Sequence, residues 1–447
     1  MFKEIIQQPK FLLVLVFALL ALVLSAFGVF SLALGFVLGG LLLGYIFFGK
    51  YDWLILSLGP LGLIFGSFFS FEPRPNWVYE ASISEAIILF LAGLLLIRII
   101  FEFPKFRPRV GSVGLWMLLY LAIGLASFFY IKNFELYVAG IKIFLLSFLA
   151  YLLAFNFLNS FNKIRVFMVS LSLTVTLLSL ELLHNLYLVG FSVALFADRT
   201  YLGVTMGPLA LVAALLSLLT PIMLGYYFEL KSDDKLRILL LISFVLGFTA
   251  VCATLSKAAI GSLALAMLFL FIKLKEKRLA MVLFLISFAL LGYTFLSPYA
   301  EGLFDRFSIV VEDPNTRFRF EEYSQASKII RDHPWLGVGA GQQLMYYQRL
   351  ISPDYREWVN NYLLQALVDY GVIGLSVYLA LITSIIVMSV KMIKKHQRPL
   401  AWALVAGFIA AFFNGLVEVT LLTAPYAVIF WLLVGTAAAV LKIKKSV

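Results

Sequence analysis

Charged residues and cysteine are both scarce in this chain. Only 13% of its 447 residues are Asp, Glu, Lys or Arg, about half the share of an ordinary soluble domain. This shortage excludes the soluble class, because 63% of the residues are hydrophobic and repeated apolar runs of about 20 residues predict membrane-spanning helices. The single cysteine, Cys252, excludes an internal disulfide, and its apolar surroundings do not favour a catalytic thiol.

The apolar runs predict an all-α fold, a polytopic membrane bundle of about 12–14 transmembrane helices. The first run follows Lys3 and Lys10 but lacks an A-x-A-like cleavage site, so it is interpreted as a helix rather than a signal peptide. The predicted spans lie near 11–29, 31–48, 53–71, 83–101, 112–130, 136–155, 166–189, 208–228, 238–254, 257–272, 279–297, 362–390, 400–417 and 420–441.

Most basic residues fall on alternate connections between these spans, and the positive-inside rule makes those connections cytoplasmic. We therefore expect both termini in the cytoplasm and the connections 72–82, 190–207 and 298–361 on the outside. The net charge of +11 is mainly this topology signal. Because it is spread over many short loops, it does not predict nucleic-acid binding.

The segment 298–359 is polar although the rest of the chain is hydrophobic. It carries Arg317 and Arg319, and two further cations, Arg199 and Lys257, also lie on the predicted outward side. The topology rule does not account for these four residues. Their convergence at the outer membrane boundary would suit a pyrophosphate, whose oxygens match the guanidinium fork.

Three segments resemble motifs of the O-antigen ligase and O-antigen polymerase superfamily, bacterial integral-membrane glycosyltransferases. The motifs are, in chain order, Arg199-x-x-x-Gly203 with Pro208; Ser256-Lys257-Ala258-Ala259-Ile260-Gly261; and Arg319-x-x-x-Tyr323-x-x-Ala326 with Asp332-His333-Pro334-x-x-Gly337-x-Gly339, continuing into Asn360-Asn361-Tyr362-Leu363. The chain then divides into N-terminal transmembrane helices, 1–189, and a catalytic transmembrane region, 190–447, that includes a periplasmic loop at 298–361.

The resemblance implies an enzyme of the bacterial inner membrane whose active site faces the periplasm. Its donor would be an undecaprenyl-diphosphate-linked glycan. A ligase would use lipid A–core as the acceptor, and a polymerase would use another lipid-linked glycan. Membrane lipid is the remaining expected partner. The family uses neither a metal nor another cofactor, and it inverts the anomeric carbon.

The resemblance also gives roles to individual residues. Arg199, Lys257, Arg317 and Asn361 are the expected substrate-binding residues, and Arg319 is expected to stabilise the leaving group. Asn360 stands where the family's ligases carry a His that activates the acceptor hydroxyl. A neutral amide orients a hydroxyl but cannot act as a base near pH 7, so this position is a departure from the family pattern.

Either another group takes the proton, or the step needs little help from a base. Asp354 and Glu357 are the preferred bases because they lie just outside the next span. Sequence alone does not choose among the candidates. The remaining ones are Asp369, which a continuous helix would place too deep, the more remote Glu321 and Glu322, and then His333 and His184.

Structural interpretations of the same cations stay open. Arg199 could extend to lipid phosphates, Lys257 could cap a tight turn, and Arg317 could lie on the wet face of an amphipathic helix. Gly337-x-Gly339-x-Gly341 does not predict a nucleotide loop, because no strand precedes it.

A transporter or flippase is the alternative from another functional class. Many transporters show two similar halves and interrupted helices, and this chain shows no such repeat. Ionisable residues expected at mid-span are few, namely Lys142, His184 and Glu418. A long outward loop with helical periodicity fits an enzyme better.

The topology can be tested with fused reporter enzymes. A reporter fused after Ala340 should be active only outside the cytoplasm, and one fused after Lys275 or Lys395 only inside, because the basic connections stay with the cytoplasm. The measurement is the activity ratio of a periplasmic and a cytoplasmic reporter at each position. Cytoplasmic activity at Ala340 would place the polar loop on the wrong side for a periplasmic donor.

Overall fold

The computed structural model describes residues 44–45, 51–65, 67–74, 77–102, 106–189, 204–206, 208–274, 314–346 and 359–443. Within them, 8 helices are long and apolar enough to cross a membrane, and two shorter apolar helices, Asp52–Ile64 and Pro399–Gly415, accompany them. The predicted polytopic helical bundle is therefore confirmed. The predicted spans 11–29, 31–48 and 279–297 lie wholly or almost wholly outside the described residues.

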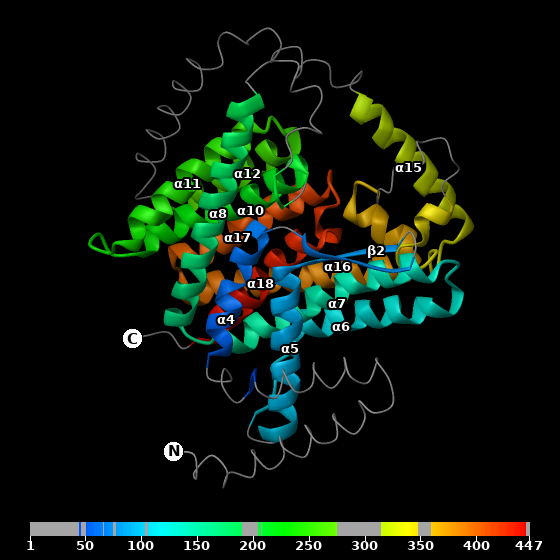
Figure 1. The fold of residues 1–447 in the computed structure, drawn as a ribbon, viewed down its shortest axis with the longest axis horizontal. Coiled ribbons are helices and arrows are strands. Elements are labelled where there is room, and N and C mark those ends of the chain that lie inside the picture. The colour runs from blue at the N-terminus through cyan, green and yellow to red at the C-terminus, as the bar shows by residue number, and fades with distance from the viewer. Residues whose placement is uncertain are drawn as a thin grey trace.

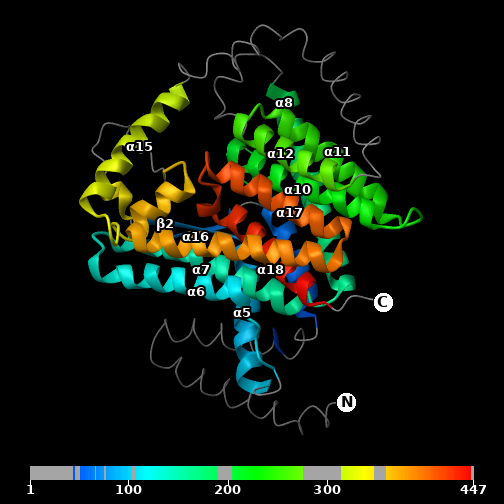
Figure 2. The ribbon, with the colours of Figure 1, turned by 180° about the vertical axis from the view of Figure 1, so that it is seen from behind.

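Figure 1 shows the bundle from one side and Figure 2 from behind. Its helices are α4 (Asp52–Leu58), η1 (Gly59–Phe65), α5 (Ile83–Glu102), α6 (Gly111–Ala126), η2 (Ser127–Tyr130), α7 (Phe134–Phe157), α8 (Phe161–Val189), α10 (Leu209–Glu229), α11 (Leu236–Ala253), α12 (Lys257–Lys273), α15 (Pro314–Asp332), η6 (Gln342–Met345), α16 (Tyr362–His396), α17 (Pro399–Gly415), η7 (Thr420–Leu422) and α18 (Ala424–Lys442).

The predicted span 53–71 ends earlier in the structure. Helix α4 gives way to the 3₁₀ helix η1, and the chain then forms an antiparallel hairpin of β1 (Ser67–Arg74) and β2 (Trp77–Ser82). Pro60 has no backbone N–H for a helical hydrogen bond, and the aromatic residues that follow favour a strand. One short hairpin therefore accompanies the helices.

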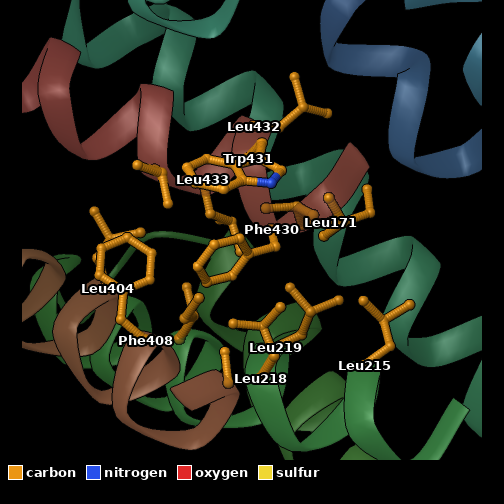
Figure 3. Close-up of a cluster of buried hydrophobic side chains, with 14 of the residues drawn as sticks. Leu171, Leu215, Leu218, Leu219, Leu404, Phe408, Phe430, Trp431, Leu432 and Leu433 are labelled. Atoms are coloured by element: carbon orange, nitrogen blue, oxygen red, sulfur yellow. The ribbon is translucent and has the colours of Figure 1, made fainter. Parts of the chain in front are cut away.

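The centre of the bundle lies where α18 packs against α7 and α10 packs against α17 and α11. Figure 3 shows the leucines of α10, the aromatic rings of α18 and Leu404 and Phe408 of α17 side by side. Lipid tails are as apolar as leucine, so close packing rather than exclusion from water holds such helices together. Gly407 allows this approach, because a Cβ there would lie 2.8 Å from the Leu218 carbonyl oxygen.

Connections predicted to be cytoplasmic meet at one end of the bundle. Arg165 Nη2 bonds Asp234 Oδ1 at 2.8 Å, which joins the start of α8 to the connection between α10 and α11. Lys395 Nζ donates to the Leu441 carbonyl at 2.7 Å, which joins the ends of α16 and α18. Segments far apart in the chain but on the same predicted side thus lie together.

Connections predicted to face outward meet at the opposite end. The Gln342 side-chain oxygen accepts hydrogen bonds from the backbone N–H groups of Lys132 (3.0 Å) and Asn133 (2.9 Å), which ties the polar loop to the connection between α6 and α7. Phe129 and Trp335 are 87% and 69% exposed at this end. Exposed aromatic rings are typical of a membrane–water boundary.

The glycine-rich turn after α15 packs directly on the backbone of α16. Gly337 and Gly371 both have positive φ, at 64° and 60°. A Cβ at Gly337 would overlap the backbone of Asp369, and a Cβ at Gly371 would overlap that of Trp335. The Gly339 N–H donates to the Asp369 carbonyl at 2.8 Å. These glycines therefore join two backbones and do not form a nucleotide loop.

Alanine at either glycine should destabilise the protein. Gly337→Ala and Gly371→Ala each add a Cβ where backbone atoms already lie and force a left-handed φ on an L side chain, at a cost of at least about 2 kcal/mol. Gly261→Ala is the matched control, since no described atom lies within 4 Å of its Cβ position. The measurement is the thermal unfolding midpoint in detergent, and equal midpoints for all three variants would contradict the packing role.

Candidate functional site

Helix α15 lies against the first turns of α16, as both views show (Figures 1 and 2). Ala326 and Ile329 of α15 are buried in a small cluster with Val338, Val359 and Val368. The helical spacing of apolar residues in the sequence predicted such a face. Because this packing fixes α15, the polar residues on its flank are held at the N-terminus of α16.

Asn360 contacts a buried carboxylate. Its Nδ2 donates to Glu322 Oε2 at 3.1 Å and to Oε1 at 3.4 Å. The Tyr323 hydroxyl donates to the Asn360 carbonyl at 3.2 Å, and burial raises the pKa of Tyr323, which keeps that hydroxyl protonated. Glu322 is 1% exposed, so its carboxylate orients Asn360 and does not contact a substrate directly.

Asn361 caps helix α16. Its Oδ1 accepts hydrogen bonds from the N–H groups of Leu363 (2.9 Å) and Leu364 (3.1 Å), the role of an N-cap residue. Its Nδ2 donates to the Leu416 carbonyl at 3.0 Å. Asn361 therefore fixes the start of α16 to the turn between α17 and α18.

Arg319 forms an ion pair with Glu418, in which Nη2 donates to Oε1. The two side chains are 27% and 21% exposed. The expectation that Glu418 lies at mid-span is wrong. Helix α17 ends at Gly415 and α18 begins at Ala424, so Glu418 lies in the turn between them.

The same turn is held on α16 from a second direction. The Tyr362 hydroxyl accepts a hydrogen bond from the Leu421 N–H at 2.5 Å and lies 2.8 Å from Thr420 Oγ1. Gly415 faces the Tyr362 ring, so a side chain there would overlap it. Burial raises the pKa of Glu418 above that of an ordinary glutamate, while the charge of Arg319 opposes the rise.

Lys257 opens helix α12 at the same end of the bundle. The N-cap is Ser256, whose hydroxyl accepts from the Ala259 N–H at 3.5 Å. The N-terminus of a helix usually favours negative charge, so a lysine in the first turn is unfavourable by itself. Its presence there favours a role in binding an anion. Helix α12 packs on α17, whose end leads to Glu418.

The side chains of four other predicted residues lie outside the described part of the structure. Arg317 lies within α15, but only its backbone belongs to the described structure. Arg199, Asp354 and Glu357 lie outside the described residues. Their predicted roles stay predictions.

Two of the alternative bases, Asp369 and His333, contact other protein groups. Asp369 is 1% exposed and lines a cavity of about 40 Å³ with Tyr120 and Gln365, room for a water molecule. The His333 ring packs edge-on against Tyr346, with centroids 5.3 Å apart. Both contacts suit a structural role better than contact with an acceptor.

Residues 242–379 match the family model described as O-antigen ligase. No curated protein matches the chain. The match confirms the resemblance stated from the motifs, and it supports a membrane glycosyltransferase of the O-antigen ligase or polymerase type. It contains Lys257, Arg319, Glu322, Asn360 and Asn361, and it ends before Glu418.

Sequence reasoning did not place Glu418 in the site. The available signal was Asn414-Gly415, which favours a helix end, followed by a charged residue between two apolar runs. The sequence suggested Glu322 only as a remote base. In the structure it contacts Asn360, the residue that replaces the family's His, and so it ties α15 to that position. That contact could not be read from a separation of 38 residues.

The pairing of Asn360 with Glu322 predicts a charge-dependent stability. Asn360→Asp would set two carboxylates about 3 Å apart, and their repulsion raises the pKa of one of them. Stability should therefore fall by about 3 kcal/mol at pH 8 and recover as pH falls and that carboxyl takes up a proton. The measurement is the unfolding midpoint at pH 8 and pH 5.

The double variant Asn360→Asp with Glu322→Gln is the control. Its Gln side chain can donate to the new carboxylate, so it should be more stable at pH 8 than Asn360→Asp alone. Equal midpoints for the single and double variants would show that the two side chains do not interact.

Proposed function

We propose that this protein is a glycosyltransferase of the O-antigen ligase type that moves an undecaprenyl-diphosphate-linked glycan onto a lipid A–core hydroxyl. The observation that carries the proposal is the cluster at one end of the bundle. Arg319, Asn360 and Asn361 converge there with the turn after α17, inside or beside the segment that matches the O-antigen ligase family.

The chemistry needs a cation at the leaving group. As the glycosidic bond breaks, negative charge develops on the bridging oxygen of the diphosphate. A fixed guanidinium in a site with little water stabilises that charge most strongly. Arg319 is less than one-third exposed, and Lys257 at the start of α12 and Arg199 before α10 are the proposed second and third cations. We propose that the reaction needs no metal and inverts the anomeric carbon.

The proposed location is the bacterial inner membrane, with the site facing the periplasm. Two groups of contacts support this orientation. The connections rich in Lys and Arg meet at one end of the bundle, and the candidate site lies at the other end. The positive-inside rule assigns the basic end to the cytoplasm.

An O-antigen polymerase would use the same donor and the same cations, so only the acceptor separates it from a ligase. The transporter alternative draws less support. Lys142, one of the ionisable residues expected at mid-span, forms an ion pair with Glu85 at 3.1 Å that joins α7 to α5. Such a pair suits helix packing.

Transfer by the purified protein tests the proposal. With a lipid-linked glycan donor, lipid A–core and EDTA, and without nucleotide, the wild-type protein should form the ligated product. Arg319→Ala should lower the rate by about 100- to 1,000-fold, as expected for loss of one charge-stabilising donor. The measurement is product formation over time at matched protein concentration.

Arg331→Ala is the matched control, because Arg331 is an exposed arginine near the end of the same helix. Its transfer rate should equal that of the wild type. Normal turnover in Arg319→Ala would reduce Arg319 to a residue on a solvated helix face. Transfer to a lipid-linked glycan but not to lipid A–core would favour the polymerase.

A further inference from the structure

We propose that Glu418 is the general base that takes the proton of the acceptor hydroxyl, and that Arg319 holds its carboxylate until the donor diphosphate binds. This inference rests on the proposed function and deepens it. Glu418 lies outside the matched segment 242–379, so the family match assigns it no role.

The position of Glu418 follows from contacts on two sides. Arg319 holds its carboxylate from α15. Leu416, two residues earlier, accepts the hydrogen bond of Asn361 from the first turn of α16. Asn360 is next to Asn361 and is tied to α15 through Glu322. Glu418 therefore lies beside the position where the family's ligases carry their His.

Accessibility distinguishes Glu418 from Glu322 and Asp369, the two buried carboxylates near the site. A base must reach within about 3 Å of the hydroxyl proton it removes. Glu322 and Asp369 are each 1% exposed and are engaged with or surrounded by protein groups. Glu418 is 21% exposed, enough for an acceptor to reach it while most of the side chain stays dry.

The ion pair with Glu418 leaves Arg319 able to bind the donor diphosphate. A guanidinium has five N–H donors, and the pair with Glu418 uses Nη2. A diphosphate carries more negative charge than a carboxylate and binds a guanidinium in a bidentate manner. Donor binding would therefore exchange the partner of Arg319 and free the carboxylate on the acceptor side.

The freed carboxylate is a better base than an ordinary glutamate. Burial raises the pKa of Glu418, and Arg319 is the group that lowers it, so loss of the pair raises the pKa further. Three tyrosines among the described residues also face this turn, namely Tyr323 from α15, Tyr362 from α16 and Tyr426 from α18. They are neutral near pH 7.

The proposed step balances as a single displacement. The acceptor oxygen bonds to the anomeric carbon while its proton passes to a Glu418 carboxylate oxygen. The bond from the anomeric carbon to the diphosphate oxygen breaks, and its electron pair leaves with undecaprenyl diphosphate. Glu418 then releases the proton to water and returns to Arg319.

The test compares Glu418→Gln, Glu418→Asp and Asp233→Asn with the wild type. Asp233 is an exposed carboxylate in the connection between α10 and α11, away from the candidate site, and serves as the control. Transfer is measured from pH 4 to 9, and binding of undecaprenyl diphosphate is measured separately. Thermal unfolding midpoints check that each variant folds.

Glu418→Gln should lower transfer by about 100-fold or more without weakening undecaprenyl diphosphate binding, since the competing carboxylate is gone. Its residual activity should lack the acid limb of the pH profile. Glu418→Asp should keep that limb and recover part of the rate. Asp233→Asn should match the wild type.

Weaker undecaprenyl diphosphate binding by Glu418→Gln, with the acid limb unchanged, would show that Glu418 only positions Arg319 and would overturn the base assignment. Wild-type rates in a folded Glu418→Gln would do the same. If the wild type itself neither binds undecaprenyl diphosphate nor transfers a glycan, the proposed function fails, and that outcome is visible before any variant is made.

Discussion

The contact of the glycine-rich turn with the kink in α16 is the constraint on which the candidate site depends. The turn follows α15, and the kink at Gly371 lies less than three helical turns from the N-terminus of α16. Two backbones meet there with no side chain between them. This contact fixes the position of the C-terminal end of α15, and so it influences which residues of α15 reach Asn360.

The polar groups of the site are tolerated near the membrane boundary because they are paired. A buried charge or amide is costly unless it has a hydrogen-bond or ionic partner. Here Glu322 accepts from Asn360, Asn361 caps α16 while donating to Leu416, and Arg319 pairs with Glu418. Each pairing joins two different elements, so the polar groups specify the arrangement of the helices they lie on.

Much of the bundle follows from the sequence. Apolar runs of about 20 residues leave few alternatives in a membrane, so the helices from α5 onward lie close to their predicted spans. The hairpin after Pro60 does not follow, because apolar length alone does not distinguish a helix from aromatic strands. Glu418 was expected at mid-span, although the predicted spans end at 417 and resume at 420, and the structure places it in the turn after α17.

Part of the candidate site was predictable from the sequence, and part was not. The resemblance to the family motifs predicted roles for Arg319 and Asn360 and included the glycines, because each motif is a short, local pattern in the chain. The partners of these residues are not local. Glu418 is 99 residues from Arg319, and Glu322 is 38 from Asn360, so no single-sequence pattern links them.

The amide at position 360 is consistent with its surroundings. A His at that position could exchange a proton with a neighbouring carboxyl group. Asn360 instead donates hydrogen bonds to both oxygens of Glu322 and transfers no proton. On the other side of the cluster, Arg319 pairs with Glu418. Removing Arg319 from that pair is the change that would leave a partly buried carboxylate without a counter-charge, and such a group gains stability by binding a proton. Under the mechanism proposed above, an acceptor hydroxyl supplies that proton after the donor diphosphate has taken Arg319, so the electrostatics of the cluster favour donor binding before proton transfer.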